Sequence, residues 1–238
     1  MPQFHYRLRI ILFFVNLADV SRRTLKQSRP VANFFTRLMN VIGGYKFPHF
    51  YAVTDRSFKS KEGHEIKLKI YTPHKSLEPL PVWLYIHGGG FAFGAYDARS
   101  NFCKAIATRA NCIVVSIQYR LAPENPFPAA PNDCYEAACW VSEHAHEFGG
   151  NAQKIAVGGE SAGGNLSAVL AQMARDKGGL KIIHQTLMYP TVDATLNYKS
   201  IDEFATGYML TKALMHKFHS AYVPNTADHK NPYCSPIY

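Results

Sequence analysis

The sequence predicts an α/β fold in which helices cover both faces of a mostly parallel sheet. Short apolar runs bounded by turn residues recur along the chain, at 82–87, 112–119, 155–157 and 182–189. Helical stretches follow two of these runs, at 134–144 and from 162 to about 174. Strands that alternate with helices through short links build parallel sheets with right-handed crossovers. Ligands bind at the carboxyl ends of the strands in such sheets.

The composition fits one globular domain with a sizeable core, because 47% of the 238 residues are hydrophobic and 18% are charged. The net charge is +9, and residues 1–50 carry most of it, with eight Lys or Arg and one acid, Asp19. No nucleic-acid recognition motif accompanies this basic segment, so we expect no nucleic-acid partner. A solvated basic face is the simpler interpretation, and weak contact of residues 1–50 with anionic lipid is the alternative.

Five cysteines are present, at positions 103, 112, 134, 139 and 234. Their odd number and the lack of metal-ligand spacing favour reduced thiols in the cytoplasm, with no metal and no cofactor. Residues 7–18 place a basic pair before an apolar run, as the start of a signal peptide does, but a good cleavage site is missing. Export or membrane association through residues 7–18 is therefore the alternative to a cytoplasmic protein.

Two segments are distinguished along the chain. Residues 1–50 are interpreted as an N-terminal helical lid, with an apolar helix around 10–15 and a second helix over 31–41 before Gly43-Gly44. Residues 51–238 form the α/β domain. It begins with a hairpin of two edge strands, 53–58 and 66–71, around Glu62-Gly63.

The later elements follow from the apolar runs. The run 82–87 is typical of a buried parallel strand, and 112–119 is the next one. A loop with four prolines then leads to the helix 134–144, which Asp133 is placed to cap.

Three glycines, Gly88, Gly89 and Gly90, follow the strand 82–87. Such a loop lets backbone N–H groups point into a cavity, which is what a tetrahedral oxyanion requires. A phosphate-binding loop is the rival interpretation, and it fails because no Gly-Lys-Ser/Thr follows. His87 is interpreted as a structural residue that bonds the loop backbone.

The strand 155–157 ends in Gly159-Glu160-Ser161-Ala162-Gly163, and an Ala- and Leu-rich run follows at once. A serine on such a strand-to-helix turn is held in a strained conformation, and the glycines two before and two after it leave room for strand and helix to approach. The hydroxyl then lies at a helix N-terminus, where unpaired N–H groups favour negative charge.

These motifs occur in an order that resembles the hormone-sensitive-lipase group of α/β-hydrolases. They are HGGGF at 87–91, YRLAPE at 119–124, PFPAAPND at 126–133, GESAGGNL at 159–166, YP at 189–190, YMLT at 208–211 and NPYCSP at 231–236. The resemblance implies that Ser161 is the nucleophile. It also implies that N–H groups of Gly89, Gly90 and Ala162, with Gly88 sharing, form an oxyanion hole. Glu160 occupies a position where many relatives have Asp.

The resemblance also implies two further strand–helix units, which supply the Asp and His of the catalytic triad. Neither motif is found before Tyr238, so we expect a shortened chain in which Ser161 lacks a base and is a poor nucleophile. The loss of two strands is also expected to leave an exposed sheet edge and a marginal or aggregation-prone chain. A triad rebuilt from Asp193 with His216, His219 or His229 is the alternative, and we expect instead that these histidines lie at the surface with their hydrogen bonds satisfied.

Two function hypotheses remain. The first is a carboxylic-ester hydrolase that acts through an acyl-enzyme on small apolar esters of short or medium chain length. The second is a catalytically dead hydrolase fold that binds a ligand, because a fold alone does not decide function. The sequence does not predict the oligomeric state.

Overall fold

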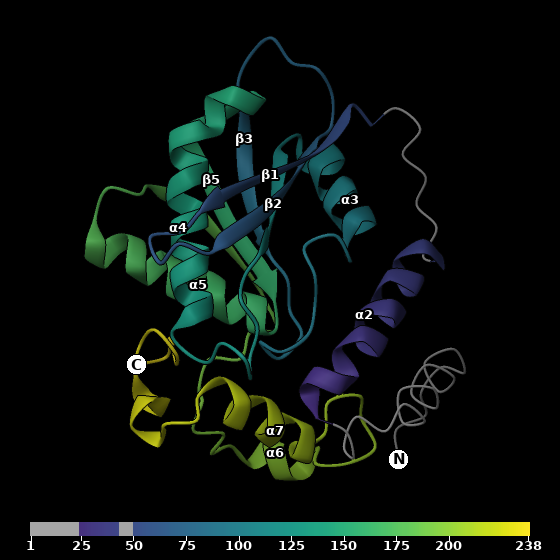
Figure 1. The fold of residues 1–238 in the computed structure, drawn as a ribbon, viewed down its shortest axis with the longest axis vertical. Helices are drawn as coiled ribbons and strands as arrows, with labels where there is room; N and C mark the ends of the chain where they lie inside the picture. The colour runs from purple at the N-terminus through teal and green to yellow at the C-terminus, as the bar shows by residue number, and fades with distance from the viewer. Residues whose placement is uncertain (1–23, 43–49) are drawn as a thin grey trace.

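A mixed sheet lies at the centre of the computed structural model, which describes residues 24–42 and 50–238 (Figure 1). Its strands are β1 (Ala52–Lys59), β2 (Glu65–Thr72), β3 (Leu80–Ile86), β4 (Ile113–Gln118), β5 (Gly150–Glu160) and β6 (Ile182–Met188). Their spatial order is β1-β2-β4-β3-β5-β6. Strands β3 to β6 are mutually parallel, whereas β2 is antiparallel to both β1 and β4. The predicted α/β fold with a mostly parallel sheet is confirmed.

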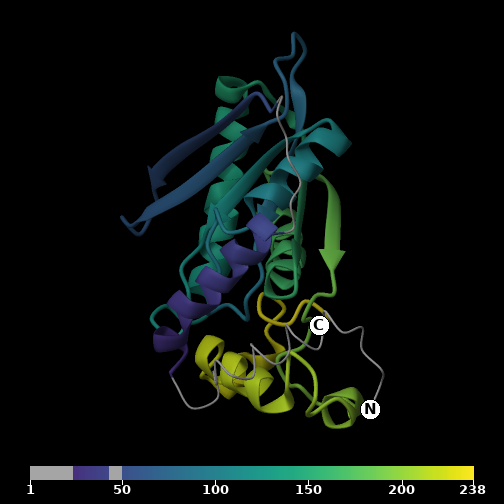
Figure 2. The same ribbon diagram turned by 90° about the vertical axis from the view of Figure 1, so that its right-hand side faces the viewer.

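Helices cover both faces of the sheet, as predicted. The helices are α2 (Leu25–Ile42), α3 (Ser100–Ala110), α4 (Ala129–His144), α5 (Ala162–Lys177), α6 (Lys199–Glu203) and α7 (Lys212–Tyr222), with short 3₁₀ helices η1 (Ala145–Phe148) and η2 (Thr226–Lys230). Helices α4 and α5 pack on one face, and α3 packs on the other, with α2 outside α3 (Figures 1 and 2). The larger apolar core lies under α4 and α5, and a smaller one with Trp83 and Tyr85 lies under α3.

The predicted hairpin forms, but only one of its strands is at the sheet edge. Strand β2 lies between β1 and β4, so its residues Ile66, Leu68 and Ile70 are fully buried. Of the two hairpin strands, only β1 lies at a sheet edge, and its side chains are all exposed or partly buried.

Helix α3 was not predicted from the sequence. It buries Cys103 and Ala107 against the sheet, and Phe102 and Ile106 pack beside them at the same helical spacing. The stretch therefore carries an apolar face with helical spacing that the sequence analysis did not use.

The start of α4 and the role of Asp133 differ from the expectation. The helix begins at Ala129, so Asp133 lies inside it and does not cap it. The buried Asp133 carboxylate instead accepts hydrogen bonds from the backbone N–H and the guanidinium of Arg120. The prolines before position 133 made this stretch look like a loop in the sequence, so the first turn of the helix was not predicted.

Helix α2 is longer than the predicted 31–41, because it begins at Leu25 and continues through Pro30. Thr24 and Gln27 form a capping box before the helix: each side chain accepts a hydrogen bond from the backbone N–H of the other residue. Proline usually ends a helix, which explains the late start in the prediction. The apolar run at 10–15 and the segment 7–18 lie outside the described residues.

Candidate active site

Ser161 lies on the turn between β5 and α5, with φ 55° and ψ −116°. Its backbone N–H donates to the carbonyl of Met188 at the end of β6, at 2.9 Å. Its own carbonyl accepts the N–H of Asn165 at 3.0 Å, the first turn of α5. The turn therefore joins the carboxyl ends of two parallel strands to a helix N-terminus, and it is strained as the sequence predicts.

The glycines on either side of this turn permit a close approach of β3. A Cβ atom at Gly159 or at Gly163 would overlap with the carbonyl oxygen of Ile86. A Cβ at Gly163 would also lie 2.8 Å from the backbone of His87. Because these neighbours are backbone atoms, neither position accepts a side chain without movement of β3 or the turn.

The glycine loop after β3 lies beside the serine turn. A Cβ at Gly88 would lie 3.1 Å from Cγ of Glu160, the residue before Ser161. Gly89 and Gly90 have φ of +124° and +61°, which L-residues rarely adopt. The Gly89 carbonyl accepts the N–H of Phe93 at 2.9 Å, which closes the loop on itself.

His87 has a structural place beneath this loop, as predicted. Its Nδ1 donates to the carbonyl of Gly88 at 2.9 Å, and its ring stacks on Tyr119 with centroids 4.4 Å apart. The Tyr119 hydroxyl in turn donates to the His87 carbonyl at 2.8 Å. Burial lowers the pKa of His87 to about 4, so the ring is neutral at physiological pH.

The Glu160 carboxylate is buried between Tyr85 of β3 and Arg99, the residue before α3. The hydroxyl of Tyr85 donates to both of its carboxylate oxygens, at 2.8 and 3.0 Å, and Nε of Arg99 lies 3.4 Å from Oε1. Burial, followed by the Glu160 charge, raises the pKa of Tyr85 well above its usual value. Sequence reasoning missed Tyr85 and Arg99, and no motif marks them.

Asp193 and the later histidines do not form a triad among the described residues. The Asp193 carboxylate accepts hydrogen bonds from the backbone N–H of Thr195 and the hydroxyl of Tyr198, both at 2.8 Å. Burial raises the pKa of Asp193, but its hydrogen bonds outweigh burial and lower the pKa overall. No hydrogen bond joins this carboxylate, or the Ser161 hydroxyl, to a histidine in this part of the chain.

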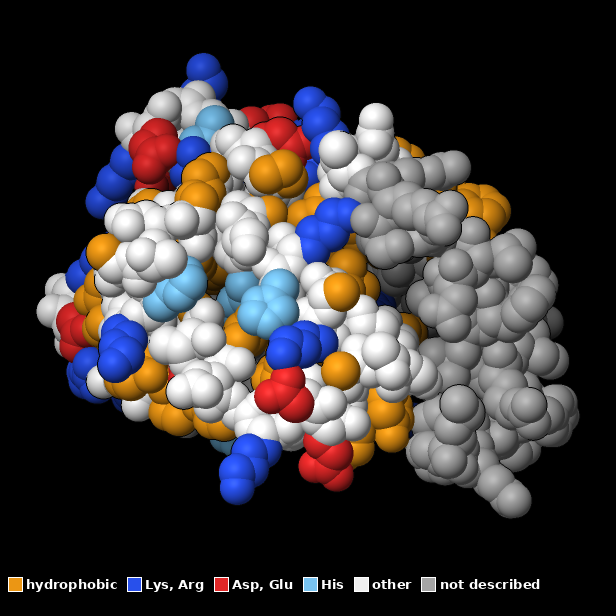
Figure 3. All heavy atoms as spheres, turned by 90° about the horizontal axis from the view of Figure 1, so that it is seen from below, with side chains coloured by type: hydrophobic (Ala, Val, Ile, Leu, Met, Phe, Trp, Pro, Cys, Tyr) orange, Lys and Arg blue, Asp and Glu red, His pale blue; other side chains and the backbone are white. Residues whose placement is uncertain are grey.

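His219 departs from the expectation of a surface histidine, because it is 9% exposed. Its Nε2 lies 3.4 Å from the hydroxyl oxygen of Thr191, and its buried Nδ1 has no partner. Burial lowers its pKa to about 4. Histidines gather on the face formed by α6 and α7, among interspersed basic and acidic side chains (Figure 3).

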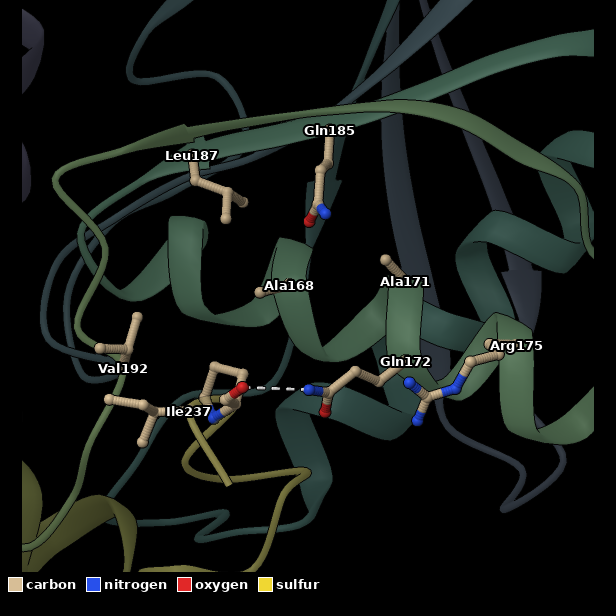
Figure 4. Close-up of a pocket in the computed structure, with 9 residues that line it drawn as sticks. Ala168, Ala171, Gln172, Arg175, Gln185, Leu187, Val192 and Ile237 are labelled. Atoms are coloured by element: carbon tan, nitrogen blue, oxygen red, sulfur yellow. Dashed lines mark hydrogen bonds between the residues drawn. The ribbon is translucent and has the colours of Figure 1, made fainter.

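A groove of 440 Å³ lies between α5 and β6, away from Ser161 (Figure 4). Leu187 and Gln185 of β6 point toward α5, and Gln172 donates to the carbonyl of Pro236 at 3.1 Å. The lining residues are Ala168, Ala171, Gln172, Arg175, Gln185, Leu187, Val192, Pro236 and Ile237.

Neither metal-binding nor thiol chemistry is supported in the described part of the chain. Residues 24–42 and 50–238 contain no group of three or more His, Cys, Asp or Glu side chains that could hold a metal ion. All five cysteines are free thiols. Burial raises the pKa of Cys112 to about 11 and of Cys234 to about 12, so these thiols are poor nucleophiles. None of the described helices is long and apolar enough to cross a membrane.

The fold and the site together define an α/β protein with a serine on a strand-to-helix turn beside a glycine loop. The sequence profile described as alpha/beta hydrolase fold matches residues 83–238. The chain belongs to this family, in the group of esterases that resemble hormone-sensitive lipase.

Individual relatives agree with this assignment. Carboxylesterase NlhH of Mycobacterium tuberculosis is 44% identical over 167 residues, which cover 69% of this chain and 52% of the relative. Ethyl acetate hydrolase of Pseudomonas putida is 33% identical over 188 residues, covering 78% and 59%. The solved structure of a hyperthermophilic esterase from Pyrobaculum calidifontis superimposes with a TM-score of 0.89 at 35% identity, covering 100% of this chain and 76% of that one. The chain spans about half the length of the curated relatives it matches.

Proposed function

We propose that the protein containing this chain hydrolyses carboxylic esters, and that Ser161 is its nucleophile. The observation that carries the proposal is the strained Ser161 at the end of β5, with φ 55° and a glycine loop beside it. Strain of this kind persists only where the surrounding structure imposes it, and it is concentrated at functional sites. The curated relatives named carboxylesterase or ethyl acetate hydrolase support the same reaction.

The oxyanion hole is assigned to the backbone N–H groups of Gly88, Gly89, Gly90 and Ala162. Ala162 is the first residue of α5, so its N–H has no partner within the helix and lies at the positive end of the helix dipole. Gly89 and Gly90 adopt positive φ, which turns their peptide planes out of the strand direction. Attack by Ser161 Oγ on an ester carbonyl places negative charge on the carbonyl oxygen, and such N–H groups stabilise that charge.

The proposed substrate is a small, uncharged ester with a short or medium acyl chain. Ethyl acetate, the substrate in one relative's name, belongs to this class. A base must accept the Ser161 proton, and by family resemblance it is a histidine oriented by an aspartate that follow Ser161 in sequence. No residue of this chain is assigned to either role. A cytoplasmic location is proposed from the five free thiols.

The second hypothesis, a fold that binds a ligand without catalysis, receives no support from these comparisons. The relatives reported above are hydrolases by name, and the serine and both glycine motifs of the site are present in this chain.

The test compares the 238-residue chain with its Ser161→Ala variant in the hydrolysis of p-nitrophenyl butyrate. Without a base, the oxyanion hole and binding alone leave an acceleration of roughly 10³–10⁴ over water in serine hydrolases that lack triad members. We therefore expect only a small Ser161-dependent rate from the chain as printed. A fusion to the two C-terminal strand–helix units of a full-length relative is expected to turn over with full dependence on Ser161.

Two outcomes would change this assignment. A folded fusion whose Ser161→Ala variant is equally active would refute Ser161 as the nucleophile. A rate of the unfused chain at least about a thousandfold above Ser161→Ala would require an internal base, since the hole alone then no longer accounts for the difference. His216, His219, His229 and Asp193 would then be substituted one at a time.

A further inference from the structure

Helix α2 holds the backbone that follows the glycine loop, and Arg29 makes the first set of contacts. Its Nε donates to the carbonyl of Ala92 at 2.7 Å, and its NH2 group donates to the carbonyl of Ala122 at 2.7 Å. The same guanidinium makes two hydrogen bonds to the Glu124 carboxylate, at 2.7 and 3.1 Å. One side chain thus joins the loop after β3 to the loop after β4.

Asn33, one turn further along α2, makes the second set of contacts. Its Oδ1 accepts the backbone N–H of Gly94 at 2.9 Å, and its Nδ2 donates to the Gly94 carbonyl at 3.4 Å. The Asn33 amide thus hydrogen-bonds both the N–H and the C=O of Gly94, as a neighbouring strand would do in a sheet. Gly94 itself has φ +107°, so no regular element satisfies these groups.

The glycine loop needs such support because few of its own contacts fix it. Gly89, Gly90 and Phe91 all have positive φ, at +124°, +61° and +60°. The internal hydrogen bonds of this segment are those of the Gly89 carbonyl to the N–H groups of Ala92 and Phe93. Glycine residues also lose the most conformational freedom on ordering, so an unsupported loop would sample other conformations.

Packing completes the support from two sides. Leu25 of α2, Ala92 of the loop and Phe218 of α7 form one buried apolar cluster. The Phe218 ring lies directly against Gly90, where an added Cβ would be 2.5 to 2.7 Å from its Cδ atoms. The loop therefore lies between α2 and α7. Its side-chain hydrogen bonds come from Arg29 and Asn33 of α2, and one backbone hydrogen bond, from the N–H of Ala122 to the carbonyl of Phe91 at 2.9 Å, comes from the segment after β4.

We propose that Arg29 and Asn33 are positioning residues for the oxyanion hole: they fix the backbone of 91–94 so that the N–H groups of Gly89 and Gly90 face the carbonyl oxygen bound at Ser161. This inference rests on the proposed function. Displacement of a preorganised group by about 1 Å costs on the order of 10²-fold in rate, because the developing charge is then poorly stabilised. The two side chains do not touch the reacting atoms.

The variants are Arg29→Lys, Arg29→Ala and Asn33→Ala, with Arg37→Ala as the matched control. Each is made in the 238-residue chain for hydrogen exchange and in its fusion to the two C-terminal strand–helix units for the rates. Lysine keeps the charge beside Glu124 but cannot reproduce the fork that bonds two carbonyls and a carboxylate. Arg37 lies on the same helix, and its NH2 group bonds the side chain of Asp97 at 2.9 Å. Two readouts are taken: amide hydrogen exchange of residues 88–94, and the Ser161-dependent rate with p-nitrophenyl butyrate.

The expected result is faster exchange at 88–94 in the Arg29 and Asn33 variants and unchanged exchange in Arg37→Ala. The Ser161-dependent kcat should fall by about tenfold or more with KM changed less than about twofold, since an oxyanion hole acts on the transition state. Rates are measured well below each variant's melting temperature, so general unfolding does not contribute.

Several results would overturn the proposal. Exchange at 88–94 that does not change in the Arg29 and Asn33 variants would overturn it, and so would a loss shared equally by Arg37→Ala. The proposal would also fail if these variants exchange faster at 88–94 but keep an unchanged Ser161-dependent kcat. If Ser161→Ala of the fusion has the same rate as the parent fusion, the proposed function fails by itself. Hydrogen exchange then still decides whether α2 orders the loop.

Discussion

Ser161 and its neighbouring glycines show how single residues shape the site. Backbone strain of the kind seen at Ser161 costs on the order of 1–3 kcal/mol and must be offset by surrounding contacts. The offsetting contacts are the hydrogen bonds to Met188 and Asn165 and the tight contact between β3 and the turn. The glycines at 159 and 163 are therefore requirements of packing as well as of the motif.

We predict that Gly163→Ala destabilises the protein by about 3 kcal/mol, although alanine is normally favoured over glycine inside a helix. The added methyl group would meet the backbone of Ile86 and His87, which cannot rotate away as a side chain can. Gly149→Ala is the control, because Gly149 has φ +79° with open space around it and should cost only about 1 kcal/mol. Urea unfolding measures both values. Equal costs would show that overlap with β3 is unimportant.

The buried His219 predicts a pH dependence of stability. Burial lowers its pKa to about 4, so the folded chain binds no proton there between pH 4 and 6.5 while the unfolded chain does. The contribution of His219 to the free energy of unfolding is therefore complete above about pH 6.5. It decreases as the pH drops toward 4, by up to about 1.4 kcal/mol per pH unit. His219→Gln should reduce this slope to the part that comes from His87, whose pKa burial also lowers to about 4, whereas His146→Gln, at an exposed position, should leave it unchanged. Denaturant unfolding at several pH values gives the slopes, and parallel slopes in His219→Gln and the parent would contradict the assignment.

At the scale of elements, Asp133 joins three parts of the fold. Its carboxylate accepts from Arg120 just after β4, and it lies 2.9 Å from Nε2 of His64 in the turn between β1 and β2. The residue itself is in α4 and only 1% exposed. One buried acid thus holds the antiparallel hairpin, the central strand β4 and α4 in register.

Asp133→Ala is predicted to destabilise the protein by about 3 kcal/mol, because it leaves the partly buried Arg120 without its main partner. The remaining contact of Arg120 with Glu62 at 2.7 Å keeps the loss at the lower end of the range for buried pairs. Asp202→Ala removes an exposed ion pair with Lys212 and should cost less than about 1 kcal/mol. Thermal and urea unfolding provide the comparison. A loss below 1 kcal/mol for Asp133→Ala would refute the joining role.

The elements differ in how far the sequence predicts them, for physical reasons. Strands β3 and β4 are continuous apolar runs and were located within two residues, because both faces of a parallel strand are buried. Helix α3 carries an apolar face at helical spacing, with Phe102, Cys103, Ile106 and Ala107, so its periodicity could have predicted it. The part of α2 before Pro30 was not predicted, because proline usually ends a helix. The capping box of Thr24 and Gln27 nevertheless marks its start.

The same distinction applies to the site. Ser161 and the loop Gly88–Gly90 are local motifs, and the structure brings them side by side through Gly88 and Glu160. Arg29, Asn33 and Tyr85 act through contacts across 60 or more positions of sequence, and no local pattern marks such pairs. Long-range support of a site therefore has to be taken from the three-dimensional contacts.

For the molecule as a whole, the site and the open sheet edge lie at different places. The ends of β3, β5 and β6 converge at the serine turn, whereas the outer edge of β6 carries no strand among the described residues (Figure 2). Ile183 and Leu187 on this strand are 52% and 37% exposed, and Leu187 also lines the groove between α5 and β6. An unpaired parallel edge with exposed apolar side chains is a template for further strand pairing.

We predict that the 238-residue chain self-associates through the outer edge of β6. The outward N–H and C=O groups of β6 pair with no strand among residues 24–42 and 50–238, and these groups and the apolar side chains beside them favour contact with another chain. Replacing Ile183 and Leu187 with lysine should raise the monomer fraction in sedimentation velocity at tens of micromolar protein, because charges on an edge strand oppose pairing. Val53→Lys is the control, since Val53 is 41% exposed on β1 at the opposite edge. A parent chain that sediments as a monomer across this range would refute the prediction. An equal gain from Val53→Lys would instead show that the effect is one of net charge and not of the β6 edge.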